Sequence, residues 1–305
     1  MDIQYIGIDI GRGYTKAYTE IGKEKLSLMY KSVIGDAREN KVEYKYYDNS
    51  SHIEYEGRQY FIGLLAEQES YSPIRNSADS KISKTVEILL VSVLERLAHK
   101  EKVNIMLGVP YKNFTQQTLK EIKNKYEDKV YEVKNKINGS FKRVKINKIG
   151  IFREADSALI YALNGKCNSD RPVGLINIGF RTLEYTYFDK NFRYNDSLSG
   201  TLEYGNSTIL KIISDRLMTQ GIVKTINEID TSDDYGDMKR EVYELASERI
   251  VQSIEEIWIN ANSEMKLYAS GGTTLNLSLD SKFEILKDSQ LATAKGLYLL
   301  SKMEG

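Results

Sequence analysis

The sequence predicts an α/β protein of two similar lobes, each a mixed sheet flanked by helices. The main support is a pattern that occurs twice, in Tyr5–Glu20 (YIGIDIGRGYTKAYTE) and in Gly174–Asp189 (GLINIGFRTLEYTYFD). Each copy runs from an apolar strand through a polar residue and Ile-Gly to a basic residue, a hydroxyl residue and a second strand. Because one copy falls in each half of the chain, the pattern indicates a ligand held between two related lobes.

The first copy has the composition of a phosphate-binding hairpin. Gly11 and Gly13 allow a sharp turn that brings backbone N–H groups close to an anion. Thr15 and Lys16 supply a hydroxyl and a positive charge for phosphate oxygens, and Asp9 is placed to hold Mg²⁺ through water. A strand, not a helix, is expected to follow, which excludes a P-loop and a dinucleotide-binding fingerprint. Taken alone, the stretch could also be an ordinary hairpin with a glycine turn.

A third glycine-bearing element is LYASGGTTLNL, residues Leu267–Leu277. Its first residues end a strand, and Gly271 and Gly272 leave room for a flat ring or a phosphate against the backbone. Thr273 and Thr274 are expected to cap a following helix or to bond the nucleotide. The motif is weak evidence alone and gains weight from the two hairpins that precede it.

In this order, the motifs resemble those of the superfamily of actin, sugar kinases and chaperone ATPases, and most closely the bacterial actin-like proteins of the ParM type. GIDIGRGYTK and GLINIGFRTLEYTYF match the two phosphate loops, and ASGGTT matches the adenosine loop. IFREADSALIYAL and QLATAKGLYLLSKM match two connecting helices, and LGVPYKNF matches a strand, a proline and a helix start. The resemblance implies an actin-like, ribonuclease H-like fold with inserted subdomains.

The resemblance also implies a site for ATP or ADP with Mg²⁺. Glu154, just inside the first connecting helix, would position the attacking water, and Asp9 would orient the metal. The nucleotide would be held by three loops: Gly11, Arg12, Gly13, Tyr14, Thr15 and Lys16; Asn177, Gly179, Phe180, Arg181 and Thr182; and Gly271, Gly272 and Thr273.

Two of these roles have simpler alternatives. A glutamate in the first turn of a helix is favoured by the helix dipole, so Glu154 is explained about equally well as a structural residue. Lys16 could be a solvated hairpin lysine. Their places in the ordered pattern favour the roles in the site.

The second loop departs from the family pattern. Asn177 stands where the family usually has aspartate, and Phe180 stands in place of a second glycine, whereas Glu184 keeps a charge where aspartate is frequent. Asparagine retains a hydrogen-bonding side chain but loses the charge, so metal-linked water would be held less firmly. We expect slower hydrolysis with nucleotide binding retained.

Composition argues against nucleic-acid binding, disulfide bonding and a membrane location. The 305 residues are enough for two domains, and 28% are charged, with 43 basic and 43 acidic side chains. Because the charges balance, the chain lacks the excess of basic residues typical of nucleic-acid-binding proteins, and no direct nucleic-acid contact is expected. The single cysteine, Cys167, cannot form an internal disulfide, which suits the cytoplasm. No membrane partner is expected, because no apolar run is long enough to span a bilayer and no signal peptide begins the chain.

The predicted first lobe comprises residues 1–157, with an inserted subdomain at about 31–80 that closes over the nucleotide, and is completed by the C-terminal helix 289–305. Residues 158–288 form the second lobe. Within the first lobe, apolar spacing predicts a helix over 81–99, and Asn138-Gly139 predicts a hairpin.

In the second lobe, Asn206 or Ser207 is expected to cap a helix that Gly221 stops. A longer amphipathic helix is expected over about 237–262. It could form a coiled-coil seam, but a core-facing helix is the preferred interpretation.

The predicted function is nucleotide-dependent filament formation, with hydrolysis of ATP, or of GTP, driving polymer dynamics in plasmid DNA segregation. The partners would be further copies of the chain and a DNA-binding adaptor protein on a centromere-like site. A small-molecule kinase of the same superfamily and a non-dynamic actin-like scaffold are the alternatives. The kinase lacks support from any evident sugar-binding cluster.

Overall fold

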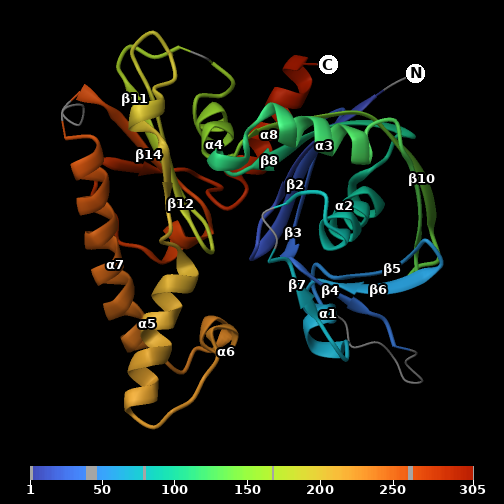
Figure 1. Cartoon of the computed structure of the whole chain (residues 1–305), viewed down its shortest axis with the longest axis horizontal. Coiled ribbons are helices and arrows are strands. Elements are labelled where there is room, and N and C mark those ends of the chain that lie inside the picture. Colours follow the sequence, from blue (N-terminus) through green and yellow to red (C-terminus); the bar gives the residue numbers. More distant parts are fainter. Residues whose placement is uncertain (1–2, 39–46, 78–79, 167, 260–263, 305) are drawn as a thin grey trace. The chain divides into compact units, whose positions relative to one another are not determined.

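The computed structural model describes residues 3–38, 47–77, 80–166, 168–259 and 264–304. The chain divides into two compact units (Figure 1). Unit 1 is Met1–Ser157 with Thr293–Gly305, and unit 2 is Ala158–Ala292. Each unit has its own sheet. In the described part of the chain, no helix is both long enough and apolar enough to cross a membrane.

The sheet of unit 1 has the strand order β3-β2-β1-β8-β10-β9-β5-β6-β4-β7. Its central strands β1, β8 and β10 are parallel, and the pairs on either side are antiparallel. The strands are β1 (Gln4–Ile10), β2 (Tyr14–Ile21), β3 (Glu24–Lys31), β4 (Val33–Asp36), β5 (Ser51–Tyr55), β6 (Arg58–Ile62), β7 (Ile74–Arg75), β8 (Lys102–Val109), β9 (Val130–Asn135) and β10 (Phe141–Arg153).

Helices cover this sheet. They are α1 (Leu64–Glu69), α2 (Lys84–Leu97), α3 (Gln116–Tyr126), the start of α4 (Glu154–Ala162) and α8 (Ala292–Glu304) (Figure 1). Buried residues of α2, such as Leu89 and Leu90, join the isoleucines of β1 in one core. Helix α8 lies so close to β1 that a Cβ on Gly7 would be 2.1 Å from the Ala294 carbonyl oxygen. This close approach requires glycine.

Several local predictions for unit 1 are confirmed. The helix predicted over 81–99 is α2, and its N-cap Ser83 accepts a hydrogen bond from the Val86 N–H. The Asn138-Gly139 hairpin joins β9 to β10, with Gly139 at φ 75°.

The sequence of residues 31–80 predicts an irregular, tyrosine-rich segment with two strand-like stretches, KVEYKYYD and HIEYEGRQYFIG. The second stretch is confirmed as β5 and β6, which together with β4 and β7 continue the sheet beyond β9, so the segment is more regular than predicted. Most of the predicted strand KVEYKYYD lies outside the described residues, as does Cys167. Closure of this insert over a nucleotide stays a prediction.

The sheet of unit 2 repeats half of the first one. Its order is β13-β12-β11-β14-β15, formed by β11 (Val173–Ile178), β12 (Leu183–Phe188), β13 (Gly200–Leu202), β14 (Lys266–Ser270) and β15 (Phe283–Ile285). As in β3-β2-β1-β8-β10, the central strand pairs antiparallel on one side and parallel on the other, and the next strand outward is parallel again. The two units therefore contain the same five-stranded motif.

Helices α5 (Asn206–Thr219) and α7 (Gly236–Ile257) run side by side, with the short α6 (Ile226–Thr231) next to α5 (Figure 1). The long helix α7 faces the core, as predicted, through buried residues that include Ile250 and Ile254. Leu245 departs from this face and is half exposed. Just after the helix, the buried Trp258 donates a hydrogen bond of 2.9 Å from its indole nitrogen to the Leu198 carbonyl.

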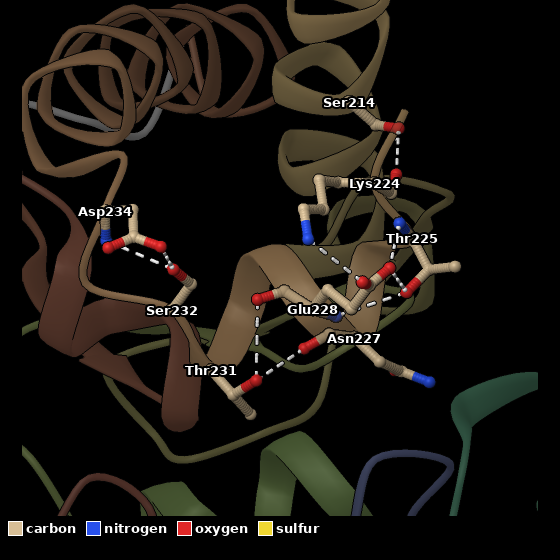
Figure 2. Close-up of polar contacts among 8 residues, drawn as sticks. All are labelled: Ser214, Lys224, Thr225, Asn227, Glu228, Thr231, Ser232 and Asp234. Carbon is tan, nitrogen blue, oxygen red and sulfur yellow. Dashed lines mark hydrogen bonds and ion pairs between the residues drawn. The ribbon is translucent and has the colours of Figure 1, made fainter. Parts of the chain in front are cut away.

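Helix α6 is fixed by its own polar side chains (Figure 2). Thr225 and Glu228 form a capping box in which each side chain accepts from the other residue's backbone N–H. The hydrogen bond from the Thr225 backbone is the main cause that lowers the pKa of Glu228 to about 2. Ser214 of α5 donates a hydrogen bond of 2.9 Å to the Lys224 carbonyl, which ties the start of α6 to α5.

Candidate nucleotide-binding site

The two predicted phosphate loops have the same backbone geometry. In unit 1, the Gly11 N–H donates to the Tyr14 carbonyl over 3.0 Å, and in unit 2 the Gly179 N–H donates to the Thr182 carbonyl over 2.9 Å. Each turn follows the central strand of its sheet and leads into the antiparallel neighbour. A repeated pattern in the sequence thus corresponds to a repeated turn in the structure.

The strand register shows which residues of the two loops correspond. Asp9 lies opposite Lys16, and in the second loop Asn177 lies opposite Glu184. The opposed charged pair of unit 1 is therefore replaced in unit 2 by an amide and a carboxylate. The basic residues do not correspond, because Arg12 is the second residue of its turn and Arg181 the third.

Asp9 has a buried carboxylate oxygen that could accept a hydrogen bond from the water of a hydrated cation. The residue is only 5% exposed, and its Oδ2 lies 3.5 Å from the Lys16 Nζ. Its Oδ1 is buried without a hydrogen-bond partner among the described residues. A buried acceptor of this kind is costly unless something donates to it. Water bound to Mg²⁺ would donate such a hydrogen bond, so Asp9 fits the predicted metal role.

No three His, Cys, Asp or Glu side chains of the described residues gather closely enough to hold a metal ion. Magnesium in nucleotide sites is typically held by one or two carboxylates, by water and by the phosphates of the substrate. A single carboxylate at Asp9 is consistent with that arrangement.

Glu154 begins helix α4 directly after strand β10, in the same unit as Asp9. Its side chain is 17% exposed, and its Oε1 lies 3.5 Å from the Nζ of the buried Lys81. Burial raises the pKa of the Glu154 carboxyl to about 7; the Lys81 amine opposes this shift, and the Asp9 charge adds to it. A carboxyl that titrates near neutral pH in a buried site is suited to general acid–base work.

Lys81 was missed by the sequence analysis, where it is only the first residue of a predicted helix. In the structure its ammonium donates a hydrogen bond of 2.7 Å to the Ile10 carbonyl. It therefore lies between the end of β1 and Glu154. Nothing in its sequence neighbourhood signals this, because its partners are many residues away in the chain.

The other residues of the first loop have different surroundings. Thr15 is fully buried, and its hydroxyl lies 2.9 Å from the Ser32 hydroxyl. This contact holds the turn on its buried side. Tyr14 is 36% exposed, Arg12 and Gly11 are partly exposed, and Gly13 is buried.

The second loop is held by the start of helix α5. The Asn206 N–H donates to the Gly179 carbonyl over 3.1 Å, and the Ser207 N–H donates to the Phe180 carbonyl over 2.7 Å. Gly205 makes this approach possible, since a Cβ there would lie 2.5 Å from the Arg181 carbonyl carbon. The loop carbonyls thus satisfy N–H groups that a helix start leaves unpaired.

The prediction that the side chain of Asn206 or Ser207 caps α5 was wrong. Gly205 is the N-cap residue, and no side chain caps the helix. The Asn206 side chain instead accepts a hydrogen bond of 2.6 Å from Tyr243 of α7 and donates one of 3.2 Å to Asp230 of α6. Tertiary contacts therefore outweigh the local capping preference.

The predicted adenosine loop lies beside the second phosphate loop. Thr273 donates to the Gly179 carbonyl over 2.9 Å, and Ser270 donates to the Asn177 Oδ1 over 3.1 Å. Gly271, at φ 98°, lies against β11, where a Cβ would be 2.2 Å from the Ile178 carbonyl oxygen. Gly271 is therefore required by backbone packing, whatever ligand the loop holds.

The threonines do not cap a following helix through their side chains. Gly271 is the N-cap residue of the short 3-10 helix η4 (Gly272–Asn276), and its start has no side-chain cap hydrogen bond. Thr274 donates to the Gly271 carbonyl over 2.6 Å instead. Both hydroxyls fix the loop.

Comparison with known proteins supports an actin-like fold. Residues 7–155 match the family described as the N-terminal domain of actin-like proteins. The structure of the archaeal actin homologue Ta0583 is similar, with a TM-score of 0.81 at 18% identity over 99% of this chain and 100% of the other. Ta0583 in complex with ADP has a TM-score of 0.79 at 17% identity, covering 99% of this chain and 100% of the other. No curated protein matches the chain.

A ParM from Clostridium botulinum, solved as a 15-stranded filament, has a TM-score of 0.81 at 18% identity, covering 99% of this chain and 100% of the other. The match over residues 7–155 and the similarity of the whole fold agree with the actin-like class that the motifs predicted. The fold of the chain is that of ParM and the archaeal actin homologue, which confirms the predicted fold class.

The raised pKa of Glu154 leads to a prediction about stability. Because the folded form holds this proton more tightly than the unfolded form, the contribution of Glu154 to stability falls as pH rises from about 4.5 to about 7. We expect Glu154→Gln to be about 1–3 kcal/mol more stable than the natural protein at pH 8 and equally stable at pH 4.5. Urea unfolding of both proteins across this range measures the difference. An unchanged difference at all pH values would contradict the prediction.

Proposed function

We propose that this chain forms nucleotide-dependent filaments and hydrolyses ATP, or GTP, to drive their dynamics. The observation that carries the proposal is the cluster at the first turn. Asp9 pairs with Lys16 there, and Glu154 interacts with both charges and is linked through Lys81 to the end of β1, in one unit and beside a turn that recurs in the other unit. The ADP complex of the archaeal actin homologue supports nucleotide binding by this fold.

The proposed reaction needs little covalent chemistry from the protein. Phosphoryl transfer to water depends on positioning and on stabilising charge. Glu154 would align the attacking water and accept its proton, Lys16 and the turn amides would bind phosphate oxygens, and Asp9 would hold hydrated Mg²⁺. The metal would offset negative charge on the phosphates. The glycine-bearing loops of unit 2 would hold the nucleotide from the second lobe.

Filament formation is the second part of the proposal. The Clostridium botulinum ParM is known as a filament, and a head-to-tail contact that does not close on itself generates one. Nucleotide with its γ-phosphate would favour the polymer and the diphosphate would favour release, through different affinities for two arrangements of the lobes. We propose plasmid DNA segregation as the role, with a DNA-binding adaptor, since 43 basic and 43 acidic residues leave no net charge for direct DNA contact.

Asn177 favours a slowly cycling or non-dynamic filament as the second candidate. Its amide oxygen accepts a hydrogen bond from Ser270 and carries no charge. An aspartate here would be nearly isosteric and could keep the same bond from Ser270 while holding metal-bound water more firmly.

We therefore expect Asn177→Asp to release phosphate about 3- to 10-fold faster than the natural protein, because a charged hydrogen bond is stronger than a neutral one. Steady-state phosphate release at saturating ATP and Mg²⁺ measures this. Asn191→Asp, which alters an amide in the exposed loop after β12, serves as the control. Equal rates for Asn177→Asp and the natural protein would remove Asn177 as the cause of slow turnover.

The proposal is tested by sedimentation with ATP, a non-hydrolysable ATP analogue, ADP and GTP, each with Mg²⁺. We expect polymer in the pellet with ATP and with the analogue, and little with ADP. A protein that binds nucleotide but stays in the supernatant with all four would contradict filament formation. Release of ADP stimulated by a sugar, without polymer, would instead favour a kinase.

A further inference from the structure

Two side chains from the region between β7 and α2 bind consecutive carbonyls of the first phosphate turn. The Asn76 Nδ2 donates to the Gly11 carbonyl over 3.2 Å, and the Lys81 Nζ donates to the Ile10 carbonyl over 2.7 Å. Both residues are nearly inaccessible, at 3% and 7% exposure. Neither belongs to the motifs that predicted the site.

Asn76 connects the turn to the inserted strands. Its backbone N–H donates to the Ser32 carbonyl over 2.8 Å, and the Ser32 N–H donates to the Gly13 carbonyl over 2.9 Å. The Ser32 hydroxyl is also the partner of Thr15. Ser32 lies between β3 and β4, so Asn76 and Ser32 together attach the turn to the insert at three carbonyl or hydroxyl groups.

Lys81 is held from both ends. Its own carbonyl accepts a hydrogen bond of 2.7 Å from the buried Tyr126 of α3, and its ammonium lies 3.5 Å from Glu154. Burying an ammonium is expensive, and a well-packed apolar side chain at such a place is often at least as stabilising. A lysine here is therefore better explained by what it positions than by the stability it contributes.

Glu154 also depends on close packing. A Cβ on Gly108 would lie 3.2 Å from the Glu154 Cγ, so the side chain rests directly against β8. With β8 on one side and the Lys81 ammonium within 3.5 Å, the carboxylate has little freedom relative to the end of β1.

We infer that Asn76 and Lys81 are positioning residues of the nucleotide site: Asn76 holds the phosphate turn against the insert, and Lys81 fixes Glu154 relative to that turn. The expected effect on turnover rests on the proposed function, whereas the expected effect on the rigidity of the turn does not. A misplacement of about 1 Å at a reacting group can lower a rate by about 100-fold.

The test uses Lys81→Met and Asn76→Ala in the full chain, with Lys84→Met as the matched control. Lys84 is close in sequence but half exposed, and its ion-pair partners are Glu56 and Glu87, the second of which keeps its ion pair with Lys125 when Lys84 is replaced. Hydrogen–deuterium exchange of the peptide covering residues 7–16, without nucleotide, is the first measurement. We expect exchange to be at least about 5-fold faster in both variants and unchanged in the control, since the turn loses a fixed carbonyl. Unchanged exchange in both variants would overturn the inference.

Turnover is the second measurement. We expect Lys81→Met to release phosphate at least about 10-fold more slowly, with its Kd for ATP within about 3-fold of the natural value. Equal losses of turnover and affinity would show a general disturbance and would contradict a positioning role. If the natural protein releases no phosphate, the proposed function fails, and the exchange result still decides whether the two residues hold the turn.

Discussion

Replacing Glu154 with glutamine is expected to lower phosphate release by about 100-fold or more while nucleotide-dependent assembly remains intact. Glutamine keeps the size of the side chain and its place against Gly108 but cannot accept a proton from water. Because release of subunits would follow hydrolysis, polymers of the variant should persist after the natural protein has disassembled. Phosphate release and sedimentation over the same time course measure both effects.

The control for this variant is Glu121→Gln. Glu121 is an exposed residue of α3 whose partner is Gln117 on the same helix, so its loss should alter neither measurement. If Glu154→Gln released phosphate at the natural rate, Glu154 would have no part in hydrolysis. Its raised pKa would then reflect burial alone.

The ionisation of the Glu154 carboxyl also determines how the rate of phosphate release depends on pH. Only the ionised form of Glu154 can accept a proton, and burial raises the pKa of this carboxyl to about 7, so we expect phosphate release to rise with pH around neutrality.

The largest expected effect on stability comes from Gly271→Ala. A Cβ at this position would lie 2.2 Å from the Ile178 carbonyl oxygen, and the backbone has φ 98°, which side-chain-bearing residues rarely adopt. Relief would require β14 to move away from β11, so we expect a loss of about 3 kcal/mol or more. Urea unfolding followed by circular dichroism measures the loss.

Gly236→Ala is the matched control. Gly236 is the first residue of α7, and nothing lies within 4 Å of a Cβ there. Alanine is also the better helix former, so stability should be unchanged or slightly higher. A Gly271→Ala protein as stable as this control would show that the loop is not packed on β11 as described.

The parts of the fold that the sequence predicted are those set by local patterns. The glycine turns after Ile10 and Ile178, the Asn138-Gly139 hairpin and helix α2 each depend on residues close together in the chain. Strong periodicity and turn chemistry specify such elements, and their order was enough to indicate the actin-like fold.

The parts that could not be predicted depend on contacts between distant residues. Lys81 meets the Ile10 carbonyl across 71 positions of sequence, and Asn76 meets the Gly11 carbonyl across 65. Asn206 has the preferred chemistry of a cap, yet it bonds to two other helices because the glycine before it lies against the second loop. In each case tertiary packing, which a local pattern does not encode, decides the role.

The most direct test of the central claim is to record light scattering and phosphate release together after ATP and Mg²⁺ are added to the purified protein, with ADP and GTP in parallel samples. We expect scattering to rise with ATP but not with ADP, and phosphate release to follow the rise. A decay of the signal would mark disassembly, and a sustained signal would mark the slow cycle that Asn177 favours. Nucleotide binding without any rise in scattering and without phosphate release would contradict a filament-forming ATPase.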